Sequence, residues 1–358
     1  MHIVLMAGGV GTRFWPRSRK RNPKQLLNLV GDKSMIRQTY ERVKTLTSDD
    51  KILVITNQEL KDPIARHLPE LPKENIIAEP FGKNTAPCIG LAAAIIRKRA
   101  SADETMVVLP ADHLIKETDK FKETIKIAVI HAQKSNSLVT IGITPMYPET
   151  GYGYIQRGEP LTVIENHTIY KVKTFAEKPN LETAKLFLKS GDFLWNSGMF
   201  IWKTSTILNE FAEHQPEMAE GFEQIFRAVD TSEMEDTILD VYMRIKSISI
   251  DYAIMEVAKA VSIIEAEFTW SDLGSWEAAY AISPKDEQDN AINAKNQVVI
   301  DAQNNLIYAP KKLVALVDVE NLAVVETEDA LLICRKDSSQ RVKEIVDQLA
   351  RRKLTEFL

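Results

Sequence analysis

A glycine-rich turn follows the first apolar segment of the chain. Residues 3–7 (IVLMA) are short and rich in strand-forming types, and Gly8-Gly9-Val10-Gly11 comes directly after them. Glycine adopts positive φ and approaches an anion closely, so consecutive amides can face a phosphate. The dinucleotide fingerprint would need a third glycine where Phe14 stands, and the Gly-Lys-Ser/Thr of a P-loop is absent from the sequence. The turn is therefore a phosphate-binding candidate of another type, with an ordinary strand-to-helix turn as the alternative.

A run of basic residues follows this turn. Six of them lie within twelve positions of an otherwise acidic chain: Arg13, Arg17, Arg19, Lys20, Arg21 and Lys24. Arginine offers a two-pronged donor to phosphate oxygens, and lysine offers a point charge. Open α/β sheets bind ligands at the carboxyl ends of their strands, which is where this run begins. A polyphosphate site is therefore favoured over a solvated surface loop.

Two aspartates are candidates to hold a hard cation. Asp112 directly follows the apolar segment 107–111, and Asp272 lies in a Trp-Ser-Asp-Leu-Gly turn. Mg²⁺ takes one or two carboxylates and completes its shell with water and substrate phosphates. Either aspartate alone could equally be a helix cap or part of an Asx turn. His113 is next to Asp112, but no second His or Cys stands at a metal-ligand spacing, so zinc is not expected.

Short apolar strands alternate with helical segments in the N-terminal part of the chain. The predicted strands are residues 3–7, 51–56, 106–110 and 138–141, and the predicted helices are 34–46, 85–99 and 121–133. Such alternation indicates β-α-β units with right-handed crossovers. We expect an α/β fold with a doubly wound, mostly parallel, Rossmann-like sheet.

The remainder of the chain divides at a polar segment. Residues 145–284 combine hairpin-like stretches at 152–156 and 169–176 with helices at 181–190, 204–227 and 231–245. We interpret this part as an insertion that caps the sheet and forms a second wall for a ligand. Residues 283–296 are the best linker candidate, so the predicted domains are 1–284 and 285–358. The second domain is predicted to hold several short strands and a basic amphipathic helix at 339–353.

Composition excludes several classes of protein. The 358 residues are 44% hydrophobic and 27% charged, as in soluble globular proteins, and the formal charge is −5. The lack of a basic excess argues against nucleic-acid binding, and no apolar run approaches the roughly 18 residues of a membrane span. Cys88 and Cys334 are too few for a disulfide framework. We expect a cytoplasmic protein.

Segments in a fixed order give the sequence a specific family resemblance. AGGVGTRFWPRS (residues 7–18) and NPKQLL (22–27) resemble the signature of sugar-phosphate nucleotidyltransferases, in the form found in mannose-1-phosphate guanylyltransferases. The later segments that agree are EP at 79–80, NTAP at 84–87, LPADH at 109–113, GYGYI at 151–155, FAEKP at 175–179, WNSGMF at 195–200, SIDY at 249–252 and WSDLGSW at 270–276. Each segment alone is modestly specific, whereas the ordered set is very specific.

The resemblance implies a role for each matching residue. The implied nucleotide-binding residues are Ala7, Gly8, Gly9, Gly11, Thr12, Arg13, Lys24, Glu79, Pro80, Asn84, Thr85 and Asp112. The implied sugar-phosphate-binding residues are Gly153, Glu177, Lys178, Asn196 and Asp272. Asp112 and Asp272 would hold Mg²⁺, and the catalytic set would be Arg13, Lys24, Lys178, Asp112 and Asp272. Glu79 is the candidate acceptor for the N–H donors of guanine, with a buried, helix-capping glutamate as the alternative. Trp195 is either a floor beneath the sugar ring or a core residue.

By resemblance, the reaction joins GTP to mannose 1-phosphate and yields GDP-mannose and pyrophosphate. The sequence has no Ser or Cys nucleophile motif with a base partner, so direct in-line attack is expected. Another sugar phosphate and nucleotide pair, such as glucose 1-phosphate with dTTP or UTP, is one alternative. A non-catalytic scaffold of the same fold is another, and it is disfavoured because all five implied catalytic residues are present.

The C-terminal segment is expected to form a short left-handed β-helix. Such a unit packs on the catalytic domain or pairs subunits, so a homodimer is expected, because an open solenoid end exposes strand edges. The segment holds no His and Glu cluster suited to a metal-dependent isomerase. We therefore expect one activity, without the phosphomannose isomerase activity of longer members of the family.

Overall fold

The computed structural model describes residues 1–9, 11–101 and 103–358. These residues form two compact units. Unit 1 consists of Met1–Gly8, Tyr40–Ala111 and Ile115–Trp270, and unit 2 consists of Gly9–Thr39, Asp112–Leu114 and Ser271–Leu358. Val10 of the predicted glycine turn lies outside the described residues.

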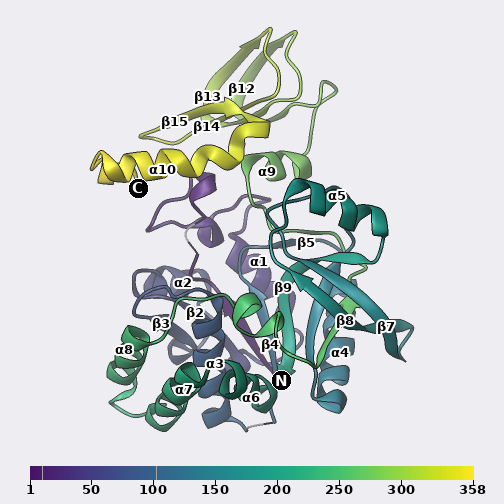
Figure 1. The fold of residues 1–358 in the computed structure, drawn as a ribbon. Coiled ribbons are helices and arrows are strands. Elements are labelled where there is room, and N and C mark those ends of the chain that lie inside the picture. The colour runs from purple at the N-terminus through teal and green to yellow at the C-terminus, as the bar shows by residue number, and fades with distance from the viewer. Residues whose placement is uncertain (10, 102) are drawn as a thin grey trace. The chain divides into compact units, whose positions relative to one another are not determined.

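Unit 1 contains the main sheet, which has nine strands in the described part of the chain, in the order β3-β2-β1-β4-β9-β6-β10-β8-β7 (Figure 1). The strands are β1 (His2–Met6), β2 (Ile52–Asn57), β3 (Ile76–Glu79), β4 (Thr105–Pro110), β6 (Leu138–Ile143), β7 (Tyr154–Ile164), β8 (His167–Ala176), β9 (Phe193–Lys203) and β10 (Val261–Glu265). Strands β1 to β4 pair in parallel, as do β6 and β10. The predicted α/β fold class is confirmed.

The helices of unit 1 match predicted ones except for a short helix at residues 61–67, which was not predicted. They are α2 (Lys61–His67), α3 (Thr85–Arg99), α4 (Thr118–Ser135), α5 (Leu181–Ser190), α6 (Thr204–His214), α7 (Pro216–Ala228) and α8 (Met234–Arg244). The predicted helix 204–227 is two helices, because Gln215 leaves helical geometry and Pro216 lacks the N–H that a continuing helix needs. Helix α1 (Met35–Val43) begins in unit 2 and ends in unit 1.

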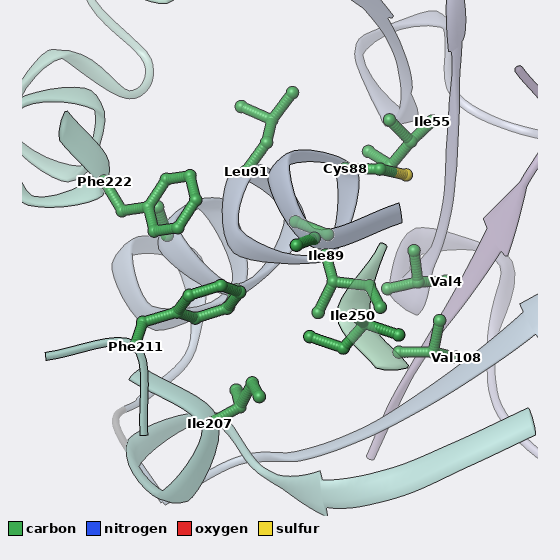
Figure 2. Close-up of a cluster of buried hydrophobic side chains, with 14 of the residues drawn as sticks. Val4, Ile55, Cys88, Ile89, Leu91, Val108, Ile207, Phe211, Phe222 and Ile250 are labelled. Carbon is green, nitrogen blue, oxygen red and sulfur yellow. The ribbon is translucent and has the colours of Figure 1, made fainter. Parts of the chain in front are cut away.

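The apolar core of unit 1 surrounds α3, as Figure 2 shows. Val4, Ile55 and Val108 reach it from β1, β2 and β4, and Phe222 reaches it from α7. A Cβ at Gly90 in the middle of α3 would collide with the Phe222 ring, so glycine lets α3 and α7 approach closely. α3 is buried along most of its length, from Ala86 to Ile96, so packing on several sides fixes its position within this unit.

The prediction that residues 145–284 cap the sheet is wrong for their strands. β7, β8, β9 and β10 are strands of the main sheet itself, and β9 lies antiparallel between β4 and β6. β9 gives no clear strand signal in the sequence, because Asn196-Ser197-Gly198 interrupt its apolar run. Pairing with neighbouring strands, rather than local propensity, decides such a segment. The predicted hairpin is confirmed, since β7 and β8 pair antiparallel.

Unit 2 contains the C-terminal sheet, with the strands β12 (Ala291–Ile300), β13 (Leu306–Val317), β14 (Leu322–Glu326) and β15 (Leu331–Arg335). β12, β13 and β14 pair in parallel, and β15 pairs antiparallel with β14. The helices of this unit are α9 (Trp276–Ile282) and α10 (Val342–Arg351), and α10 lies along this sheet (Figure 1). The predicted linker 283–296 is too long, because β12 begins at Ala291. The two short strands β5 (Leu114–Ile115) and β11 (Trp270–Ser271) lie where the chain passes between units.

Within the described residues, no helix is both long and apolar enough to cross a membrane.

Candidate active site

Three of the predicted site residues meet in unit 2 at the ammonium group of Lys24. Lys24 starts a short 3₁₀ turn (Lys24–Leu26) and is only 5% exposed. Its Nζ donates to Oδ2 of Asp112 at 2.8 Å and also to the main-chain oxygen of Asp272. A lysine is seldom this deeply buried unless it is paired. The fold therefore brings Lys24, Asp112 and Asp272 together from positions far apart in the sequence.

The charge of Lys24 controls the ionisation of Asp112. Burial acts to raise the pKa of the Asp112 carboxyl, but the positive charge of Lys24, then that of His113, and the hydrogen bond from Lys24 together outweigh this effect. The pKa of Asp112 is therefore lowered from its ordinary value. Asp112 is an ionised carboxylate at neutral pH, as a cation ligand must be.

Lys24 is held by oxygen atoms of both aspartates that are candidates for a cation. Asp112 contributes a carboxylate oxygen and Asp272 its main-chain oxygen, and oxygen is the donor type that Mg²⁺ prefers. In the described part of the chain, no group of three or more His, Cys, Asp or Glu residues could hold a metal by itself. A divalent cation here would therefore take its remaining ligands from water and from substrate phosphates.

The glycine turn is shaped around Lys24. Gly11 has a left-handed φ of 67°, and a Cβ at this position would collide with the side chain of Lys24. Gly11 is followed by a 3₁₀ turn (Thr12–Phe14), in which Arg13 is exposed while Phe14 is buried. The Phe14 ring packs edge-on against Trp276 at 4.9 Å between centroids. Anchored in this way, the turn presents Arg13 to solvent.

Two arginines of the basic run have contacts that the sequence analysis did not foresee. The guanidinium of Arg17 lies 4.0 Å from the ring centre of Tyr308 and donates to the side chain of Asn28. Arg19 forms an ion pair with Asp329 at 2.9 Å. Both arginines thus contact other residues of unit 2. These contacts explain their presence in the basic run 13–24 without a role in phosphate binding.

Glu79, in unit 1, is a buried carboxylate at the end of β3. It is 4% exposed, and its Oε1 accepts a hydrogen bond from the hydroxyl of Tyr242 at 2.9 Å. Burial raises the pKa of Glu79 to about 7, although the Tyr242 hydrogen bond acts to lower it. Ala7 is also buried, with its amide and carbonyl bonded to β2 residues. Pro80 follows Glu79 and is half-buried.

The helix that follows has its own cap. The side chain of Asn84 accepts from the amide of Thr85 at 2.9 Å, so Asn84, and not Glu79, caps α3. The Thr85 hydroxyl accepts from the amide of Ile250 at 2.8 Å. The capping alternative for Glu79 is thus wrong.

The predicted sugar-phosphate residues of unit 1 form one cluster. A Cβ at Gly153 would collide with a carboxylate oxygen of Glu177, and the other Glu177 oxygen pairs with Lys178 Nζ at 2.5 Å. The amide nitrogen of Asn196 donates to the carbonyl of Gly153 at 2.8 Å. Lys178 is 59% exposed, so its ammonium can reach a ligand in solvent. Asp272, the fifth predicted residue of this set, belongs to unit 2.

Asp251 also belongs to this cluster, although it was not among the predicted site residues. The side-chain amide of Asn196 donates to its Oδ1 at 2.9 Å. Burial and then the negative charge of Glu177 raise the pKa of Asp251 to about 6. Its only sequence signal was its place in the SIDY segment, to which no role had been assigned. Trp195 is buried between Tyr147 and Tyr152, with ring centres 4.9 and 5.2 Å away.

Comparison with known proteins shows which family the chain belongs to. Residues 2–289 match the family model described as nucleotidyl transferase, and residues 295–349 match that of the mannose-phosphate isomerase/GMP-like β-helix domain. The chain is similar to proteins from Klebsiella pneumoniae and Escherichia coli, both named mannose-1-phosphate guanylyltransferase. Each is 41% identical over 99% of this chain and 75% of the relative. It is also similar to a solved structure from Thermus thermophilus, described as a mannose-1-phosphate geranyltransferase. That structure has a TM-score of 0.87 and 30% identity over 98% of this chain and 99% of the other. Nucleotidyltransferases generally use a divalent metal.

Proposed function

Because the chain belongs to the nucleotidyl transferase family, we propose that it joins GTP to α-D-mannose 1-phosphate, giving GDP-mannose and diphosphate. The contact of Lys24 with both Asp112 and Asp272 supports this proposal, because it brings the two aspartates proposed as metal ligands to one lysine beside Gly11. The names of the relatives supply the choice of guanine and mannose.

The proposed reaction is a direct displacement at phosphorus. An oxygen of the mannose 1-phosphate group attacks the α-phosphorus of GTP and forms a P–O bond, while the bond to the β-phosphate oxygen breaks and diphosphate leaves with the electron pair. Such transfer needs positioning and charge neutralisation more than covalent help from the protein. We assign Arg13 and Lys24 to the leaving diphosphate and Lys178 to the phosphate of the sugar.

Asp112 and Asp272 would hold the divalent metal, which we propose is Mg²⁺. When bound, it supplies positive charge to the phosphate oxygens of the nucleotide. In the structure, Lys24 supplies the positive charge that keeps Asp112 ionised and in place. Gly11 supports this arrangement, since any larger residue would displace the Lys24 side chain.

Unit 1 supplies groups suited to binding the mannose ring and the guanine base. Glu177 and Asn196 offer a carboxylate and an amide, which bind sugar hydroxyls directionally, and Gly153 gives the Glu177 carboxylate the room it occupies. Glu79 offers a buried acceptor for the N–H donors of guanine. The remaining nucleotide residues, Asn84 and Thr85, hold the start of α3 in place.

We also propose that two copies of the chain pair through the β12–β13 face. The apolar side chains exposed on it are Val298, Ile300, Leu313 and Val317. Ile300 pairs with Val317 in parallel register, so alternate residues share this face. β14 pairs with β13 only at residues 306–308, so within the described residues the later edge of β13 is open. An apolar face beside an open edge favours a second copy, and a 40 kDa particle in gel filtration with light scattering would exclude it.

A cytoplasmic location accompanies this proposal, because both substrates are multiply charged phosphates that do not cross membranes unaided.

A pyrophosphate-release assay with Mg²⁺ tests the proposed reaction. It crosses GTP, ATP, UTP and dTTP with mannose 1-phosphate and glucose 1-phosphate. We expect turnover largely confined to GTP with mannose 1-phosphate. Another productive pair would overturn the specificity, and no turnover from folded protein would overturn the enzymatic function.

A further inference from the structure

A buried tyrosine hydroxyl fixes one oxygen of the Glu79 carboxylate. Tyr242 lies in α8 and Glu79 ends β3, so the contact joins residues 163 positions apart. Tyr242 is 0% exposed, and its hydroxyl donates to Oε1 of Glu79 at 2.9 Å. Buried polar groups are costly unless they are hydrogen-bonded, so each member of the pair satisfies the other. The carboxylate is therefore held in one orientation by α8.

The other oxygen of Glu79 lies beside Gly8, which belongs to the same unit. A Cβ on Gly8 would lie 3.4 Å from Oε2, which places this oxygen beside the backbone at the end of β1. Among the described residues, Oε2 receives no hydrogen bond. Oε2 is thus the oxygen of this carboxylate that remains for a ligand beside Gly8.

We propose that Tyr242 is a positioning residue for base recognition, which fixes Oε1 of Glu79 so that Oε2 is aimed at the N–H donors of guanine. The inference rests on the proposed use of GTP and extends it to a residue outside the nucleotide-binding set. Guanine carries N–H donors at N1 and at its 2-amino group, whereas adenine has an acceptor at N1. A fixed, ionised acceptor therefore selects guanine and leaves adenine with an unpaired contact.

The ionisation of Glu79 gives this role a measurable signature. Burial raises the pKa of Glu79 to about 7, against the opposing effect of the Tyr242 hydrogen bond. The titratable groups that face it are Tyr242 from α8 and Cys88 from α3, and burial raises the pKa of both well above their ordinary values. Both therefore stay protonated at neutral pH, and Glu79 is the group that titrates there. Loss of the Tyr242 hydroxyl raises the pKa of Glu79 further, so less of the carboxylate is ionised at pH 7.

Tyr242→Phe tests the proposal, with Tyr40→Phe as a matched control. The Tyr40 hydroxyl also donates to a carboxylate, Asp49, at 2.9 Å, and Tyr40 is 1% exposed. The measurement is the KM for GTP and for ITP, which lacks the 2-amino group, between pH 6 and pH 9. For Tyr242→Phe we expect the KM for GTP at pH 7 to rise about tenfold, with a smaller change in kcat and partial recovery at pH 9. The preference for GTP over ITP falls, whereas Tyr40→Phe keeps the wild-type values.

A double-mutant cycle with Glu79→Gln keeps the test decisive if Tyr242→Phe folds poorly. Glutamine at 79 removes the buried charge that needs the hydroxyl, so adding Tyr242→Phe to Glu79→Gln is expected to leave the KM for GTP within twofold. Equal effects of Tyr242→Phe with and without Glu79→Gln, or a pH profile that matches that of Tyr40→Phe, would overturn the proposal. Wild-type protein that makes no GDP-mannose from GTP would overturn the proposed function instead, so the two failures are distinguishable.

Discussion

Two acidic centres of this protein show how the partner of a buried carboxylate decides its chemistry. Asp112, in unit 2, accepts a hydrogen bond from the Lys24 ammonium at 2.8 Å, whereas Asp251, in unit 1, accepts one from the neutral Asn196 amide at 2.9 Å. Burial opposes ionisation at both. The pKa of Asp112 nevertheless falls below its ordinary value, while the pKa of Asp251 rises to about 6.

The difference follows from the sign of the neighbouring charge. Asp112 faces a cation, which outweighs the cost of burial, and Asp251 faces the carboxylate of Glu177, which adds to that cost. The first centre is suited to cations and phosphates. The second is suited to hydrogen bonds with neutral hydroxyl groups. This division matches the proposed roles of unit 2 in phosphate chemistry and of unit 1 in sugar recognition.

The largest expected effect is that of Asp112→Asn. The change removes a negative charge from the Lys24 centre, so we expect kcat to fall by roughly 10²–10³. The pyrophosphate-release assay with GTP and mannose 1-phosphate measures it. Asp119→Asn is the control, because that side chain is fully exposed at the start of α4. An Asp112→Asn enzyme with more than a tenth of wild-type kcat would contradict a metal or charge role for this aspartate.

Lys24→Met tests the positively charged member of the Lys24–Asp112 pair. A hydrogen bond to a charged group contributes about 1.5–3 kcal/mol, so we expect kcat/KM for GTP to fall roughly 10- to 100-fold. Methionine keeps the buried, unbranched stem and removes only the charge. The exposed Lys20 provides the matched control, Lys20→Met, and equal losses in the two variants would show that Lys24 has no special role.

The elements around these centres could largely be predicted from local sequence. Helix α3 begins and ends at the predicted residues 85 and 99, because Asn84 caps it and basic residues fill its last turn. The strand β9 was missed, since its place between β4 and β6 depends on pairing with distant segments. Sequence patterns report local periodicity, and sheet order is decided by partners that are far away in the chain.

The same limit applies to the candidate site. The residue types of Lys24 and Asp112 could be selected from the sequence, but their ion pair spans 88 positions and has no local signal. The contacts of Arg17 and Arg19 could not be predicted for the same reason, because the residues of the basic run look alike in the sequence until Tyr308 and Asp329 are folded against them. The types and order of the residues indicate which chemistry is possible. Which of these residues contact one another can be seen only in the folded structure.

The pH dependence of the free energy of unfolding allows Asp251 and Asp112 to be compared directly. The pKa of Asp251 is raised from 3.8 to about 6 in the folded state, so its contribution to stability is full below pH 3.8 and is lost as the pH rises through about 6. Asp251→Asn lacks this loss. We therefore expect its free energy of unfolding, relative to wild type, to be about 1–2 kcal/mol larger at pH 8 than at pH 5, which means a relatively more stable variant at pH 8.

Urea unfolding at the two pH values measures this difference, and Asp112→Asn is the counterpart. The pKa of Asp112 is lowered, so its contribution is present above its ordinary value of 3.8 and is lost only as the pH falls further. Its stability difference from wild type should therefore change much less between pH 5 and pH 8 than that of Asp251→Asn, and the remaining change comes from His113, whose Nε2 lies 3.9 Å from Oδ1 of Asp112. The contrast between the two aspartates would be contradicted by either of two results. One is a pH-dependent change in the relative free energy of unfolding of Asp112→Asn as large as that expected for Asp251→Asn, and the other is no such change for Asp251→Asn.

The smallest expected effect is that of Gly153→Ala, beside the second centre. The added methyl group would meet Oε2 of Glu177, which is the flexible end of a side chain and can move aside. We expect the thermal midpoint to change little, while the KM for mannose 1-phosphate rises about three- to tenfold, because a displaced carboxylate loses about one hydrogen bond to the sugar. Gly82→Ala is the matched control, since a Cβ at Gly82 has no neighbour within 4 Å. An unchanged KM for mannose 1-phosphate in Gly153→Ala would mean that Glu177 does not contact the sugar, and the hydroxyl-binding role of unit 1 would then have to rest on Asn196 alone.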